Sequence, residues 1–473
     1  MQQYFFGIDF GTSTTAISHT KDTPSSAPQL IEIENNKIVE TVLRVSPDAK
    51  QVEMIGSEAW VNAYDAPERT FFEFKEKIGS GEKYPIDGQS LTADGIGKLF
   101  LSRLREKIEQ TIFNKKTLSE IARADKVTTV IGFPAEWKEV QKKATLQMAS
   151  GAGFPNVFGC DEPLGAIYFH YYQGELDLDK EQYVLVYDFG GGATNTAIVA
   201  IKPGVDPRVH SVAVAPNLGG KHYDERISGD VAGGICMQTG NASLLQEDIV
   251  RIRRHCRQIK ERLSLNIENR MDSAQETIQP LKCNNSDHLM TLSKDNFEKM
   301  HSDLLSDFAE PIWHVLGKAS IQAKEISMVI VTGGSGKFYF VPEKLKKIFP
   351  DATFLRSINP QECIAKGLSL YAKIRACGRE GVKPKIKSET NQLIQKVAKQ
   401  KKSSIGKKRL NQNVQTTADG KGQSKPGINP VAHEAAKQKK SGVGNNILKS
   451  LKWMILTALF LLFVFVVLGI FWK

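Results

Sequence analysis

Two segments of the sequence place an aspartate directly before a turn of small residues, a combination suited to binding phosphate and a divalent cation. They read YFFGIDFGTSTTAI at residues 4–17 and YVLVYDFGGGATNTAIV at residues 183–199. Glycines and small hydroxyl residues let backbone N–H groups converge on an anion without a Cβ in the way. Asp9 and Asp188 can then hold hydrated Mg²⁺, which prefers a few carboxylates, waters and phosphate oxygens to an all-protein cage.

Each segment has the form of a β-hairpin, and a strand followed by Asp and Gly is also typical of an ordinary hairpin turn. The repetition of the pattern favours the functional interpretation. Both segments run in the order apolar strand, Asp-Phe-Gly, small polar turn and Thr-Ala-Ile, and their aspartates stand 179 residues apart. We therefore predict that one subdomain occurs twice in the chain.

Composition and charge exclude several other classes of protein. The chain has 473 residues, enough for two or three domains. Residues 373–452 contain 20 basic and 4 acidic residues, whereas residues 1–372 carry a net charge of −6, so the overall charge of +11 does not indicate a nucleic-acid-binding body. The six cysteines form no C-x-x-C pair, which favours free thiols in a reducing compartment. The N-terminus has no secretory signal pattern.

The segments around the two hairpins show the periodic patterns of helices and strands that must position them. Apolar spacing predicts an amphipathic helix at residues 96–111, a buried strand at 127–132 and a helix at 161–169. Alternating apolar and polar residues at 29–45 predict a half-buried hairpin. Residues 266–293 are polar and predict a small β-rich subdomain.

Three further features have competing interpretations. Lys75 lies beside an aromatic cluster and reads either as a surface lysine or as a phosphate ligand. Glu162 starts a predicted helix, where it is either a favourable N-terminal charge or a carboxylate facing a water beside a phosphate. The strand, turn and helix at residues 328–349 approach the G-x-x-x-x-G-K-[ST] phosphate loop. Val331 and Phe338 occupy two of its defining positions, which excludes that motif.

The order of motifs resembles the nucleotide-binding domain of the 70-kilodalton heat-shock chaperones. GIDFGTSTT, EPLGAIYF, VYDFGGG, GGKHYDERI, IKERLS, VIVTGGS and NPQECIAKGLSLYA follow one another in the family's order and spacing across residues 1–372. The resemblance implies an α/β fold of the actin, hexokinase and sugar-kinase group, a two-lobed ATPase built on duplicated ribonuclease-H-like subdomains. Lobe I is expected at about residues 1–182 and lobe II at about 183–372, with ATP or ADP and Mg²⁺ in the cleft between them.

The resemblance also assigns roles to individual residues. Asp9 and Asp188 match the family's ligands of hydrated Mg²⁺. Lys75, Glu162 and Asp188 match the catalytic set around the γ-phosphate and the attacking water. The nucleotide contacts are expected from Gly11, Thr12, Ser13, Gly190, Gly191, Gly192, Gly219, Gly220, Lys260, Ser264, Gly333, Gly334, Ser335 and Lys337.

Four residues depart from the family pattern. Where the family reads GGGTFD, this chain reads GGGATN, so Ala193 lacks a hydroxyl near the γ-phosphate and Asn195 replaces a carboxylate. An amide can hydrogen-bond a water but cannot accept a proton. Arg257 stands where the family often has a glutamate to the ribose hydroxyls, and Lys337 where it has an arginine packed on adenine. We expect the fold to be retained and ATP hydrolysis to be slow.

The chain departs further from the family after residue 372. No apolar and acidic linker and no run of alternating strands follows, so we expect no client-peptide domain. The composition of residues 373–451 predicts a basic, flexible linker. Within residues 452–473, WMILTALFLLFVFVVLGIFW has no charge, and at about 1.5 Å per residue it can span a hydrocarbon core of roughly 30 Å. This predicts a single-pass tail anchor with the N-terminal domain in the cytoplasm.

These features lead to one main functional hypothesis and two alternatives. The main hypothesis is a membrane-anchored, heat-shock-70-like ATP-binding protein that acts as a nucleotide-dependent switch or recruitment platform. Its expected partners are ATP, the lipid bilayer and an unidentified protein such as a co-chaperone or nucleotide-exchange factor, with no nucleic acid. The alternatives are a membrane-bound actin-like filament or scaffold protein, and a kinase, for which the sequence shows no substrate motif.

Overall fold

The computed structural model describes residues 2–385, except residues 24, 115, 125, 241–242, 269–274, 284–285 and 357–358. The predicted transmembrane helix and most of the predicted basic linker lie outside the described residues. Within the described part of the chain, no helix combines the length and the apolar character needed to cross a bilayer.

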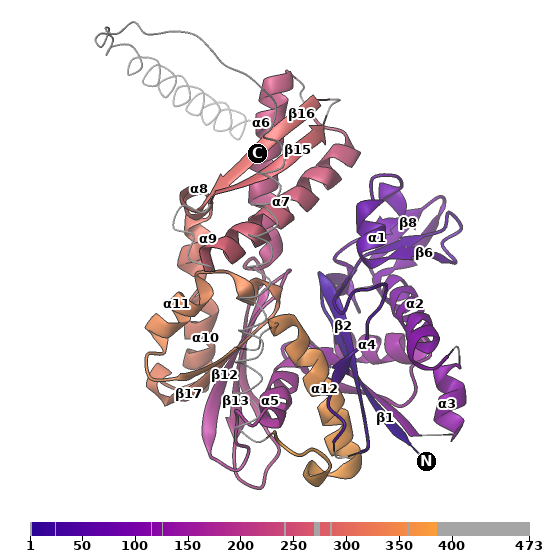
Figure 1. The fold of residues 1–473 in the computed structure, drawn as a ribbon, viewed down its shortest axis with the longest axis vertical. Helices are drawn as coiled ribbons and strands as arrows, with labels where there is room; N and C mark the ends of the chain where they lie inside the picture. Colours follow the sequence, from indigo (N-terminus) through magenta and orange to yellow (C-terminus); the bar gives the residue numbers. More distant parts are fainter. Residues whose placement is uncertain are drawn as a thin grey trace, which may run out of the picture. The chain divides into compact units, whose positions relative to one another are not determined.

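Two large sheets dominate the structure, and the second repeats the strand order of the first (Figure 1). The first runs β11-β10-β1-β2-β3, with β4 also paired to β2, and the second runs β18-β17-β12-β13-β14. The strands of the first sheet are β1 (Gln3–Phe10), β2 (Thr14–Lys21), β3 (Gln29–Leu30), β4 (Val39–Glu40), β10 (Lys126–Phe133) and β11 (Val157–Asp161). Those of the second are β12 (Gln182–Phe189), β13 (Thr194–Ile201), β14 (Arg208–Ala215), β17 (Ile326–Thr332) and β18 (Thr353–Arg356). The repetition confirms the duplication predicted from the two aspartate segments.

The register of the two sheets places both aspartates at equivalent positions. Each lies near the end of the first strand of an antiparallel hairpin, where Asp9 is paired with Ala16 and Asp188 with Asn195. On its other side β1 runs parallel to β10, and β12 runs parallel to β17. Because carboxyl ends of parallel strands meet at one edge of a sheet, the residues that follow these strands gather near the aspartates.

Helices α5 (Glu162–Tyr172) and α12 (Pro360–Cys377) lie between the two sheets, as Figure 1 shows. Glycines permit their close packing. A Cβ on Gly367 would lie 1.7 Å from the carbonyl oxygen of Gly165 in α5, and a Cβ on Gly7 of β1 would lie 2.3 Å from the carbonyl oxygen of Ala365. This crossing fixes the N-terminal ends of both helices beside the hairpin turns, and α5 begins with Glu162.

Smaller elements complete each lobe around its own apolar core. Lobe I adds β5 (Leu43–Val45), β6 (Val52–Ile55), β7 (Thr70–Phe71), β8 (Lys83–Ile86), β9 (Gln89–Thr92), α1 (Gly56–Val61), α2 (Ala93–Ile112), α3 (Leu118–Ala124) and α4 (Glu139–Gly151). Lobe II adds β15 (Gln275–Cys283), β16 (Ser286–Ser293), α6 (Gly220–Thr239), α7 (Gln246–Glu268), α8 (Lys294–Met300), α9 (Ser302–Asp307), α10 (Glu310–Ala319) and α11 (Val341–Ile348). The helix predicted at 96–111 is α2, and the β-rich segment predicted at 266–293 contains the pair β15 and β16.

Two sequence-based expectations differ from the structure. The hairpin predicted at residues 29–45 does not form, because β3 and β4 both pair with β2 and the segment closes on itself through a single bridge between Ile33 and Asn36. The last helix runs five residues beyond 372, to Cys377, and Val382 is buried behind it. The many basic residues after residue 372 gave no sign that Val382 is buried.

Candidate functional site

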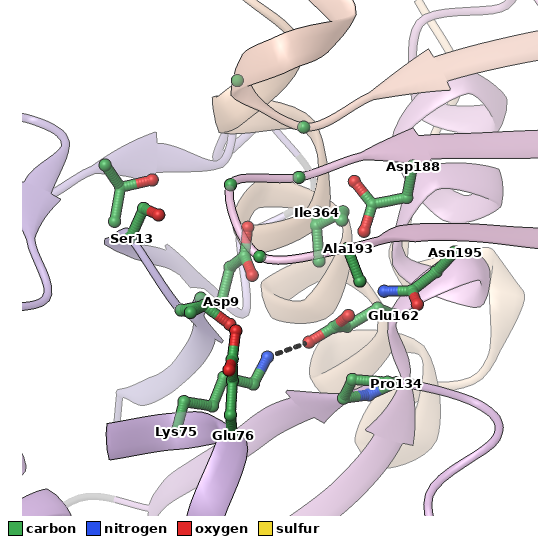
Figure 2. Close-up of a pocket in the computed structure, with 18 of the residues that line it drawn as sticks. Asp9, Ser13, Lys75, Glu76, Pro134, Glu162, Asp188, Ala193, Asn195 and Ile364 are labelled. Atoms are coloured by element: carbon green, nitrogen blue, oxygen red, sulfur yellow. Dashed lines mark hydrogen bonds and ion pairs between the residues drawn. The ribbon is translucent and has the colours of Figure 1, made fainter. Parts of the chain in front are cut away.

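A cavity of about 320 Å³ lies between the two aspartate hairpins. Most of the phosphate-end residues predicted from the sequence line it (Figure 2), namely Asp9, Gly11, Thr12, Ser13, Lys75, Glu162, Asp188, Gly190, Gly191, Gly192, Gly333 and Gly334. They come from both lobes and from segments far apart in the sequence. The structure therefore assembles them as the resemblance predicted.

The turn of the second hairpin lies so close to Ser13 and Glu76 of lobe I that a side chain added to it would displace these residues. A Cβ on Gly191 would lie 1.9 Å from Oγ of Ser13, and a Cβ on Gly192 would lie 2.5 Å from a carboxylate oxygen of Glu76. Gly333 has φ of +79°, and a Cβ there would lie 2.6 Å from Oδ1 of Asp188. The glycines thus serve close approach of the backbone to the site.

A buried ion pair crosses the floor of the cavity (Figure 2). Nζ of Lys75 lies 2.9 Å from Oε1 of Glu162, and both residues are at most 5% exposed. Lys75 belongs to a short 3-10 turn after β7, and its ammonium lies 5.3 Å from the centre of the Trp137 ring. Burial alone lowers the pKa of Lys75, but the charges of Glu162 and Asp9 outweigh it and the pKa is raised. Lys75 therefore stays protonated, and the surface-lysine interpretation does not apply.

The two aspartates experience the same crowding of negative charge to different extents. Burial and the charge of Glu162 raise the pKa of Asp9 well above its usual range. The same two causes raise the pKa of Asp188 to about 6, where hydrogen bonds from Thr332, at 2.9 Å, and from the amide of Asn195 act in the opposite direction. A cation in the cavity would stabilise the charged form of both carboxylates.

This arrangement fits the Mg²⁺ that the family implies. In the described residues, no group of three or more His, Cys, Asp or Glu side chains is placed to hold a metal unaided. Mg²⁺ is commonly held through one or two carboxylates, with waters and substrate phosphates completing the octahedron. Asp9 and Asp188 supply the carboxylates at the open cavity, and bound Mg²⁺ would neutralise developing charge on phosphate oxygens.

The residues expected around adenosine lie together but do not line the cavity. Their polar groups are engaged with one another and with nearby backbone. Lys260 contacts Asp224 at 2.7 Å and the carbonyl of Gly220 at 3.0 Å, and Ser264 donates to the carbonyl of Lys337 at 3.2 Å. The remaining contacts are Ser335 to the carbonyl of Gly190 at 2.8 Å, Lys337 to Gln361 at 2.6 Å, and the close approach of Gly219 to Gly192.

The arginine that departs from the family pattern joins the two lobes. The guanidinium of Arg257 in α7 lies 5.4 Å from the centre of the Trp60 ring in α1, and Nε lies 3.0 Å from Glu261. Six residues earlier in α7, the guanidinium of Arg251 lies 4.8 Å from the centre of the Tyr64 ring. Cation–π contacts of this kind are worth about 0.5–1 kcal/mol at exposed sites. Arg257 therefore forms a contact between α7 of lobe II and α1 of lobe I.

The two departures in the second hairpin lie at the cavity wall. Ala193 lines the cavity with its methyl group, as expected for a missing hydroxyl. The amide nitrogen of Asn195 donates to Asp188, whereas its buried Oδ1 has no hydrogen-bond partner among the described residues. The Asn195 amide therefore favours the charged form of Asp188, one of the two candidate metal-binding carboxylates.

Several cavity residues were not anticipated from the sequence, among them Glu136 and Trp137. Both come shortly after the end of β10 and line the cavity. Burial raises the pKa of Glu136 to about 7, and the charge of Glu162 adds to the effect. A usable signal was present, since an acidic residue shortly after a buried strand is expected at the carboxyl edge of a parallel sheet.

The duplicated sheets and the charged, glycine-lined cleft define a two-lobed α/β ATPase fold of the actin type. A family model described as "Hsp70 protein" matches residues 5–386, and the chain belongs to that family. This agrees with the resemblance carried by the sequence motifs.

Similar curated proteins carry the name "Chaperone protein DnaK". That of Thermosipho africanus (strain TCF52B) is 29% identical over 394 residues, covering 81% of this chain and 61% of the relative. That of Thermotoga neapolitana is 29% identical over 393 residues, and that of Thermotoga maritima 28% over 393 residues, with the same coverage. The chain thus spans about three fifths of the length of the curated relatives it matches.

Proposed function

We propose that the chain binds ATP and ADP with Mg²⁺ in the cleft and hydrolyses ATP slowly. The supporting observation is the buried Lys75–Glu162 pair, set between Asp9 and Asp188 at a cavity lined by glycines from both lobes. The excess of carboxylates in the cleft can bind the cation, and the backbone N–H groups of the glycine turns can bind phosphate. Membership of the Hsp70 family supports the same ligand.

Thermal unfolding of the full chain tests binding. Mg-ADP and Mg-ATP should raise the unfolding temperature in a saturable way, because a ligand that binds the folded state stabilises it by mass action. Nucleotide with excess EDTA should give a much smaller shift. No shift with either nucleotide at millimolar concentration would contradict the proposal.

The role we propose is a membrane-anchored, nucleotide-dependent switch that recruits a protein partner, such as a co-chaperone or nucleotide-exchange factor. The cleft supports the nucleotide dependence, and the names of the relatives support a chaperone-like context. The support for anchoring is the uncharged run of 20 residues from Trp453 to Trp472, preceded by basic residues. The positive-inside rule then places the nucleotide-binding body in the cytoplasm.

Extraction of membranes at alkaline pH tests the anchor. The full chain should stay in the membrane pellet, as integral proteins do. A variant with Val464→Arg and Leu468→Arg should move to the supernatant, because each arginine costs about 2.5–3.5 kcal/mol at the centre of a membrane helix. Equal extraction of both proteins would contradict anchoring without bearing on nucleotide binding.

A further inference from the structure

Gln361 lies at the border between the phosphate cavity and the residues expected around adenosine. It is near the start of α12 and lines the cavity. Its side-chain oxygen accepts from Nζ of Lys337 at 2.6 Å, and its amide nitrogen lies 3.4 Å from Oγ1 of Thr14 in lobe I. A Cβ on Gly334 would lie 3.2 Å from the same nitrogen. Gln361 therefore connects both lobes beside the cavity and binds Lys337, which does not line it.

The hydroxyl of Ser264, which the resemblance assigns to the nucleotide, is already used within the protein. It donates to the carbonyl of Lys337 at 3.2 Å and accepts from the backbone N–H of Tyr339 at 2.9 Å. Ser264 is only 6% exposed. Because a serine hydroxyl has a single O–H to donate, Ser264 could donate to a base only by giving up its bond to Lys337.

Lys260 is held in the same way by a buried ion pair. Its ammonium lies 2.7 Å from Asp224 and 3.0 Å from the carbonyl of Gly220, and it lies 5.3 Å from the centre of the Phe338 ring. Burial raises the pKa of Asp224, and the charge of Lys260 acts in the opposite direction. Movement of Lys260 toward a ribose would leave the Asp224 carboxylate buried without its partner, which is strongly unfavourable.

Arg257 cannot take over the role of the glutamate that the family often has at this position. A guanidinium only donates hydrogen bonds, whereas a carboxylate accepts them from ribose hydroxyls. Arg257 also has partners of its own, since Nε lies 3.0 Å from Glu261 and the guanidinium lies 5.4 Å from the centre of the Trp60 ring. The ribose contact expected from the resemblance is therefore replaced by contacts within the protein.

Nucleoside contacts in this cleft would thus replace internal contacts, whereas phosphate contacts would be gained. Exchange of one hydrogen bond for another adds little to affinity, and displaced buried partners subtract from it. At the phosphate end, bound Mg²⁺ would reduce the unfavourable burial and repulsion that raise the pKa of Asp9 and of Asp188. The free energy of binding should therefore come mainly from the phosphates and their cation.

We propose that the cleft recognises the Mg²⁺-bound triphosphate chain and distinguishes little between nucleobases, so that inorganic tripolyphosphate binds about as tightly as ATP. This inference rests on the proposed function and specifies the chemical class of its ligand. It assigns selectivity to the glycine turns, Lys75 and the two aspartates. The residues around the expected adenosine position then serve the packing of lobe II.

Calorimetric titration of the full chain tests this inference with three ligands, Mg-ATP, Mg-GTP and Mg-tripolyphosphate, at equal ionic strength and free Mg²⁺. The three dissociation constants should agree within about tenfold, because a site built to hydrogen-bond one ligand group rejects analogues without it by about 10⁴-fold or more. A preference for ATP above about tenfold over either other ligand would overturn the inference and leave the proposed function intact. Absence of binding by all three would overturn the proposed function, and the inference with it.

Lys337→Ala tests the part assigned to the bond between Lys337 and Gln361. Loss of this bond frees Gln361 and should raise the preference for ATP over tripolyphosphate by about threefold, the effect of roughly one hydrogen bond. Lys347→Ala is the matched control, an exposed lysine of α11 paired with Glu343, and should leave the preference unchanged. An unchanged or lower preference for ATP in Lys337→Ala would overturn this part, because a lysine that contacts the base would lower it.

Discussion

The first and second aspartate hairpins share a strand order and a register, yet they hold their aspartates differently. In the first, the residue paired with Asp9 is Ala16, whose methyl group offers no hydrogen bond. In the second, the residue paired with Asp188 is Asn195, whose amide donates to the carboxylate, as does Thr332 from the parallel strand. Two copies of one backbone motif therefore differ in how strongly the protein itself stabilises a negative charge.

This difference has a consequence for the two aspartates. Burial and the charge of Glu162 raise both pKa values, but the two donors limit the increase for Asp188 to about 6, whereas the pKa of Asp9 rises well above its usual range. The second hairpin region therefore supplies its aspartate with hydrogen-bond donors that Asp9 lacks among the causes of its pKa. The same substitution at Asp9 and at Asp188 should therefore change stability by different amounts.

Lys75→Met should have the largest effect, because this ammonium faces both aspartates as well as Glu162. Removal of one partner leaves a buried charge uncompensated, which typically destabilises a protein by 3–5 kcal/mol. We expect about 3 kcal/mol in denaturant unfolding and a loss of at least about 100-fold in ATP turnover. Lys77→Met, at an exposed lysine two residues away, is the control. A similar loss in both variants would show that the Lys75–Glu162 pair has no special role.

Asp9→Asn and Asp188→Asn compare the two hairpins directly. Both should weaken Mg-ADP binding by at least about tenfold in calorimetric titration, since each removes one carboxylate from the cation site. Without nucleotide at pH 8, Asp9→Asn should raise the unfolding temperature more than Asp188→Asn, because it relieves the more strongly disfavoured charge. Equal shifts in the two nucleotide-free variants would contradict the distinction drawn here.

The stability of the nucleotide-free chain should fall as pH rises from about 6 to 8. Asp188 and Glu136 have folded-state pKa values of about 6 and about 7, above the ordinary values of 3.8 and 4.5. Within this window the folded state binds more protons than the unfolded state, so raising the pH favours unfolding. The loss should be about 2 kcal/mol and smaller in Glu136→Gln, by chemical denaturation at fixed ionic strength. A stability that rises across this window would contradict the assigned shifts.

Asn195→Asp combined with Ala193→Thr should produce the smallest change, a gain of about tenfold in ATP turnover, if those departures limit hydrolysis. The same change replaces the donor to Asp188 by a second carboxylate, so the nucleotide-free protein should lose about 1 kcal/mol of stability. Measurements of ATP turnover and of denaturant unfolding on the same preparation test whether turnover rises and stability falls. Unchanged turnover would locate the limit elsewhere in the cleft.

The sequence predicted the parts of the site that are encoded in local motifs. The duplicated hairpins follow from strand, aspartate and glycine patterns, and the structure brings Lys75 and Glu162, which the resemblance singled out, together at the cavity. The order of the sheets followed from the same duplication. In these cases the local sequence pattern specifies the same arrangement that the tertiary structure adopts.

Other features depended on tertiary contacts that local patterns do not reveal. Glu136 belongs to no motif, and it reaches the cavity because it follows β10, which runs parallel to β1. The contacts of Lys260 with Asp224 and of Arg257 with Trp60 join residues 36 and 197 positions apart. Residues 29–45 alternate between apolar and polar as strands do, but β3 and β4 of this segment pair with β2 rather than with each other.

Calorimetric titration of the full chain with ATP, in the presence and absence of Mg²⁺, tests the central claim that both hairpins form one metal-dependent nucleotide site. The account predicts saturable binding of one ATP per chain that weakens at least about tenfold without Mg²⁺, or with Mg²⁺ in either Asp9→Asn or Asp188→Asn. Binding that is indifferent to Mg²⁺, or to substitution of either aspartate, would contradict it.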